Sequence, residues 1–79
     1  PARAEINHRI GRQQLRITHE VREGDLSRDE AHDLRHDLHD IRKDERSLAQ
    51  GNDNGGHLTR EQARDLNHQL NQTGHDIGH

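Results

Sequence analysis

Two segments of the chain decide its fold. They read GDLSRDEAHDL, residues 24–34, and GHLTREQARDL, residues 56–66, and they are identical at six of eleven positions. Each copy contains a capping box: Ser27 with Glu30, and Thr59 with Gln62. In such a box the hydroxyl accepts a hydrogen bond from a free N–H of the first turn, and the longer side chain reaches back to the amide of the cap. The repeat therefore predicts two helix starts, each preceded by a leucine that can pack against the new helix.

Aliphatic residues recur at helical spacing around these starts. They form three stripes: Ile6, Ile10, Ile17 and Val21; Ala31, Leu34, Leu38, Ile41 and Leu48; and Ala63, Leu66, Leu70 and Ile77. Spacing of this kind is typical of amphipathic helices. We expect helices over about residues 5–22, 27–49 and 59–77, with a Gly/Asn-rich loop at 50–58 and fraying of the third helix at Thr73-Gly74.

Length and composition indicate one small all-α domain, residues 1–79. The chain has no aromatic residue and no cysteine, and 34% of its residues are charged, so its core must be thin. Two architectures fit the three predicted helices. One is a three-helix bundle packed up-down-up, and the other is a modified pair of EF-hand-like units that share the long middle helix.

The repeat resembles the second half of an EF-hand, in which glycine is followed two residues later by an aliphatic residue, then by Ser or Thr and an acidic helix start. The resemblance covers about residues 19–70 and implies helix-loop-helix architecture. His19 and Val21 stand where the first loop of the family has its first ligands, so the resemblance places calcium in the second loop, residues 50–62 in its two possible registers. The ligands it implies there are Asn52, Asp53, Asn54 and Glu61. The alternative, which we favour, is a Gly/Asn-rich connection that holds no ligand.

Histidine is unusually frequent, with nine residues in 79. Imidazole titrates near neutral pH and also ligates transition metals. His32, His36 and His39 fall on the solvent side of the predicted middle helix, away from its aliphatic stripe. Because residues four apart stand one turn apart on a helix, His32 and His36 are placed to chelate one Zn²⁺, Cu²⁺ or Ni²⁺ ion, with His39 or Asp29 as a third ligand.

The remaining histidines give weaker signals. His68 and His75 share one side of the third predicted helix with His79, so they extend the set of candidate ligands. His8 and His19 lie on the apolar side of the first predicted helix, and we expect partial burial for them instead of ligation. Without cysteine, such sites favour borderline metals at moderate affinity, as in a metal buffer, carrier or sensor.

A second function is compatible with the same histidines. Protonating all nine would change the formal net charge from −3 to +6, and exposed imidazoles titrate around pH 6 to 7. On this interpretation the chain is a structural or protein-interaction module whose net charge changes with pH. Its partner is another copy of the chain, in a homo-oligomer, or another protein.

Several functions are not expected. No glycine-rich phosphate loop or pocket-forming apolar bulk is evident, so we expect no enzyme. We expect no nucleic-acid binding, because there is no basic block and no aromatic ring. The apolar runs are too short for a membrane span.

The chain begins at Pro1 instead of Met, as after removal of a signal peptide. We therefore expect a periplasmic or secreted protein, with the cytoplasm as the alternative.

Overall fold

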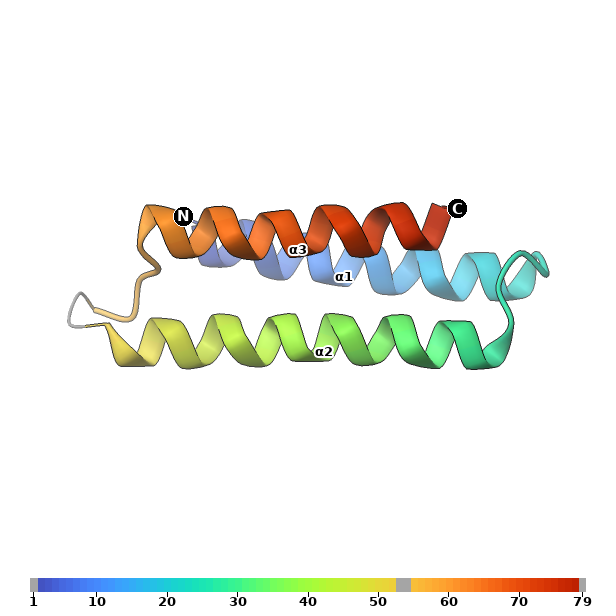
Figure 1. Ribbon diagram of the computed structural model, residues 1–79, viewed down its shortest axis with the longest axis horizontal. Coiled ribbons are helices and arrows are strands. Elements are labelled where there is room, and N and C mark those ends of the chain that lie inside the picture. Colours follow the sequence, from blue (N-terminus) through green and yellow to red (C-terminus); the bar gives the residue numbers. More distant parts are fainter. Residues whose placement is uncertain (1, 53–54, 79) are drawn as a thin grey trace.

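The computed structural model describes residues 2–52 and 55–78. Over these residues the chain forms three helices and no strand, with α1 at Ala2–Arg22, α2 at Arg28–Gly51 and α3 at Arg60–Gly78. The helices run up, down and up, and each packs against the other two in a rod of 45 × 15 × 15 Å (Figure 1). The expected all-α three-helix bundle is confirmed, and the helix limits agree with the prediction within three residues.

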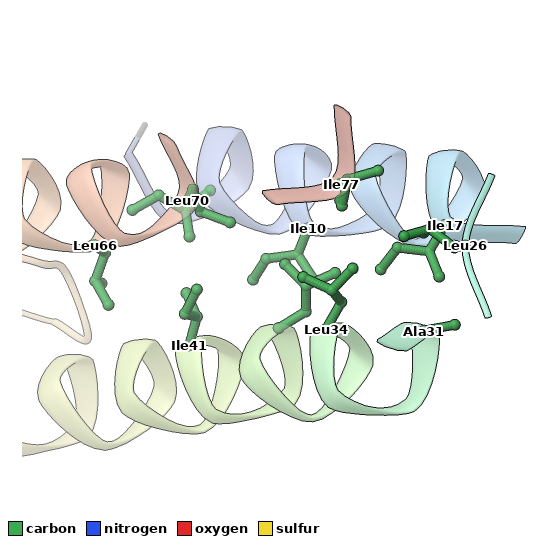
Figure 2. Packing of buried hydrophobic residues seen from close by; sticks show 11 residues of the cluster. Ile10, Ile17, Leu26, Ala31, Leu34, Ile41, Leu66, Leu70 and Ile77 are labelled. Carbon is green, nitrogen blue, oxygen red and sulfur yellow. The ribbon is translucent and has the colours of Figure 1, made fainter. Parts of the chain in front are cut away.

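The core is a narrow row of aliphatic side chains along the axis of the rod (Figure 2). Each helix contributes to it, and Leu26 joins from the turn between α1 and α2. The other buried members are Ile6, Ile10 and Ile17 of α1, Ala31, Leu34, Leu38 and Ile41 of α2, and Leu66, Leu70 and Ile77 of α3. The three predicted stripes are therefore the sides by which the helices pack.

Both capping boxes form. Ser27 Oγ accepts from the Glu30 N–H at 3.1 Å, and Glu30 Oε1 accepts from the Ser27 N–H at 3.0 Å. Thr59 and Gln62 repeat the same pair of bonds at 3.1 and 3.0 Å. Each box satisfies two backbone donors that a helix start otherwise leaves without partners. The starts of α2 and α3 are therefore fixed by local chemistry.

The glycine that opens each copy of the repeat has a left-handed backbone. Gly24 has φ of 80° and Gly56 has φ of 81°, a region that glycine enters without steric cost. After Gly24 the N–H groups of Asp25 and Leu26 both donate to Glu20 O, at 2.9 and 3.2 Å. These bonds end α1 and return the chain so that Leu26 is buried in the core.

A buried carboxylate ties the start of α1 to the end of α2. Glu45 is only 1% exposed, and its Oε1 accepts from Arg3 Nε at 2.6 Å and from Asn7 Nδ2 at 3.2 Å. Arg3 also donates to Gly56 O at 3.1 Å. One arginine therefore connects α1 to α2 and to the loop that precedes α3.

A second buried polar contact explains why α3 does not fray at Thr73-Gly74, contrary to our expectation. Gln13 Nε2 of α1 donates to Leu70 O at 2.9 Å. A Cβ atom added at Gly74 would lie 3.2 Å from that nitrogen, so glycine makes room for the approach. The contact holds α3 against α1, and the helix continues to Gly78.

The first capping box predicts a dependence of stability on acid. Its hydrogen bonds from Ser27, first the backbone bond and then the side-chain bond, lower the pKa of Glu30 below its ordinary value of 4.5. A carboxyl group with a lowered folded-state pKa stabilises the fold fully above its unfolded pKa, and this contribution is lost as the pH falls through the folded-state value. In urea titrations, we expect the advantage of the wild type over Glu30→Gln at neutral pH to shrink below about pH 4.5.

The second box supplies the matched control, because Gln62 has no charge to lose. Gln62→Glu should introduce the same kind of acid-sensitive contribution at α3. Identical pH profiles for the wild type and Glu30→Gln would contradict the interpretation.

The buried carboxylate gives a prediction about stability. Arg3→Ala removes a charge-assisted hydrogen bond and leaves the buried Glu45 with Asn7 as its remaining side-chain donor among the described residues. We expect a loss of about 1.5–3 kcal/mol in the free energy of unfolding, measured by urea denaturation. Arg12→Ala, an exposed arginine of the same helix, should change stability by less than about 0.5 kcal/mol. Equal losses in the two variants would contradict a special role for Arg3.

Candidate metal centre

The exposed face of α2 carries the three histidines predicted as metal ligands. The helix runs without a break from Arg28 to Gly51, and its buried side holds the aliphatic stripe. His32, His36 and His39 are all exposed on the remaining surface. Their placement on the solvent side of a continuous helix is therefore confirmed.

Two of these imidazoles lie beside carboxylates. His36 Nδ1 is 3.4 Å from Asp40 Oδ2, one turn further along α2. His32 Nδ1 is 3.7 Å from Asp33 Oδ1. A carboxylate beside Nδ1 favours the tautomer that carries its proton there, which leaves the Nε2 lone pair for a metal ion. The same pairing would become a salt bridge if the ring were protonated.

A third ligand does not join this pair. Over residues 2–52 and 55–78, no group of three or more His, Cys, Asp or Glu side chains is arranged to hold a metal ion. His39 and Asp29 are exposed on the same helix, but they do not complete such a group with His32 and His36. The candidate centre is therefore a pair of imidazoles one helical turn apart, not the three-ligand site that the sequence suggested.

The histidines of the other two helices are separate from this centre. His68 and His75 are exposed on α3, and seven residues of helix place them about 10 Å apart along the axis. His8 and His19 are exposed on α1, so the expectation of partial burial is wrong. The buried side of α1 is narrow and is completed by Gln13, which leaves both imidazoles outside it.

The loop proposed to bind calcium is only partly described. Asn52 Nδ2 donates to His57 O and to Gln62 Oε1, both at 2.8 Å. Its amide therefore braces the loop against the start of α3. Glu61 is exposed in the first turn of α3. Three candidate residues lie outside the described part of the chain: Asp53, Asn54 and His79.

Two charged rows were not predicted as functional features. The arginine row consists of Arg9, Arg12 and Arg16 on α1, and the aspartate row consists of Asp37, Asp40 and Asp44 on α2. Both follow the spacing i, i+3, i+7, which keeps their members on one side of a helix. That spacing is visible in the sequence, and it is the signal that could have identified them.

Comparison with known proteins adds no further constraint. No family model, curated protein sequence or solved structure matches this chain. Within the described residues, none of the helices combines the length and the apolar character needed to cross a bilayer. The functional interpretation therefore depends on the exposed side chains described above.

Proposed function

We propose that this protein reversibly binds a divalent transition metal, Zn²⁺, Cu²⁺ or Ni²⁺, through His32 and His36 of α2. The observation that supports this proposal is the pair itself. Both imidazoles are exposed on consecutive turns of one rigid helix, and each has its Nδ1 beside a carboxylate. Neutral imidazole nitrogen is a preferred ligand of these three metals.

The number of protein ligands determines how tightly the metal ion is held. With two protein ligands, water or a further molecule must fill the other coordination positions. Such a site has moderate affinity and exchanges its metal, which suits a buffer, carrier or sensor better than a closed structural site. Because the metal would bridge consecutive turns of α2, binding would also stabilise the helix and, through it, the bundle.

Thermal unfolding in the presence of metal tests the proposal. After treatment with chelator at neutral pH, melts followed by far-UV circular dichroism are repeated with Zn²⁺, Cu²⁺, Ni²⁺ or Ca²⁺. At a free metal concentration about ten times the Kd, linkage contributes about 1.4 kcal/mol, which raises Tm by about 6–11 °C in a domain of this size. We expect this rise with at least one transition metal and its loss in His32→Ala/His36→Ala.

A matched variant separates the pair from a general effect of histidine content. His8→Ala/His19→Ala removes two exposed imidazoles from α1, where they are eleven residues apart, and should keep the full metal response. An equal loss in both double variants would contradict the proposal. A response to Ca²⁺ alone, lost in Asp53→Ala or Glu61→Ala, would instead assign binding to the loop.

A second candidate function rests on a different observation. All eight histidines within the described residues are exposed. Their protonation as the pH falls would make the surface more positive without disturbing the core. The protein would then act as an interaction module that engages acidic partners at lower pH.

Binding to a model polyanion tests this second candidate. In the presence of chelator, we expect poly-glutamate to bind more tightly at about pH 5.5 than at about pH 7.5, because imidazoles gain protons over this interval. Replacing His32, His36 and His39 with Asn should reduce the difference. Binding that does not change with pH would exclude this function.

A further inference from the structure

The arginine row lines a shallow recess on α1. Arg9, Arg12 and Arg16 border it together with Gln13, and its volume is about 200 Å³. Arg9 is held in place by two side chains of α3, with Nη1 at 2.7 Å from Asn67 Oδ1 and Nη2 at 2.8 Å from Asn71 Oδ1. Within the described residues these three arginines form no ion pair with a carboxylate. Their positive charge is therefore available to a partner.

The charge of α1 differs in sign from that of the protein. The helix contains five arginines and two glutamates, although the whole chain has a formal net charge of −3. One of the five, Arg3, is already paired with Glu45. The arginine row is therefore a basic surface on an acidic molecule, and it should attract an acidic one.

The aspartate row lines a second recess, between α2 and α3. Asp37, Asp40 and Asp44 border a volume of about 360 Å³, and Asp76 of α3 adds a fourth carboxylate. Among the described residues none of these four pairs with an arginine or lysine, and Asp40 lies beside His36. This surface has the opposite charge to the arginine row.

The two rows match in length and cannot meet within one molecule. In each row the first and last residues are seven positions apart in the pattern i, i+3, i+7, or about 10 Å along a helix axis. On α3, Asn67 and Asn71 contact the arginine row, whereas Gln69 and Gln72 border the aspartate recess. These positions face different sides of the helix, so only a second molecule can bring an aspartate row to an arginine row.

One buried side chain that borders the arginine row is only partly hydrogen bonded. Gln13 is 6% exposed, its Nε2 donates to Leu70 O, and its Oε1 is buried with no hydrogen-bond partner among the described residues. A buried acceptor without a donor is costly.

We propose that the arginine row of one molecule docks onto the aspartate row of a second copy of this chain. The contact is heterologous, so each docked molecule keeps one row free and further copies can add in the same way. Pairs of exposed charges contribute little individually, and a contact of about two helical turns is short. The association is therefore weak and sensitive to salt.

Sedimentation velocity in the presence of chelator tests the proposal independently of metal binding. At about 20 mM salt, where screening is weak, we expect the weight-average sedimentation coefficient to rise with protein concentration. At about 500 mM salt the wild type should sediment as a monomer at all concentrations. A monomer at both salt concentrations would overturn the proposal.

Charge reversal identifies the surfaces. Arg12→Glu/Arg16→Glu and Asp37→Arg/Asp44→Arg should each be monomeric at low salt, because each variant then carries two rows of the same sign. An equimolar mixture should associate again, because every row then finds an opposite one on the other variant. A mixture that stays monomeric would overturn the pairing of these two rows.

A control variant with the same change in net charge distinguishes loss of the arginine row from a general effect of charge on association. Arg42→Glu/Arg46→Glu alters two exposed arginines of α2 that border neither row's recess. This variant should still associate at low salt. Loss of association equal to that of Arg12→Glu/Arg16→Glu would contradict the proposal, and circular dichroism of each variant confirms that it is folded.

Discussion

The narrowness of the aliphatic stripes is the constraint on which the rest of this structure depends. Each helix buries a single row of aliphatic residues, and the chain has no aromatic residue to widen it. The bundle is therefore only 15 Å across in both short directions. Polar side chains complete the interior, with Gln13 between α1 and α3 and Glu45 between α1 and α2. Because each helix uses so little of its circumference for packing, the remainder is free to carry histidines and charges.

The parts of the fold that could be predicted are those encoded over a few neighbouring residues. A capping box needs only a hydroxyl and a partner three residues later, so Ser27 and Thr59 located the starts of α2 and α3 correctly. The phase of the aliphatic stripes similarly located the core. The part of the α2 surface that lies opposite its stripe is the exposed side, and it was located in the same way. The solvent-facing positions of His32, His36 and His39 follow from that phase alone.

The parts that could not be predicted depend on contacts between distant residues. Glu45 falls in phase with Ile41 on the buried side of α2, but its partner Arg3 is 42 residues away in the sequence, and no local pattern identifies it. The same limit applies to the candidate metal centre. Helical phase gives the direction in which His39 or Asp29 points, but it does not show whether their atoms converge with His32 and His36 on one ion.

The odd number of helices places the ends of the described chain toward opposite ends of the rod (Figure 1). Tension applied between those ends would act nearly parallel to all three helix axes. All three interfaces between the helices would then be loaded in shear, so that contacts along their whole length resist sliding together. A bundle with its ends side by side would instead be peeled open one contact at a time. In this fold, the aliphatic contacts that form the thin core would therefore carry such a load together.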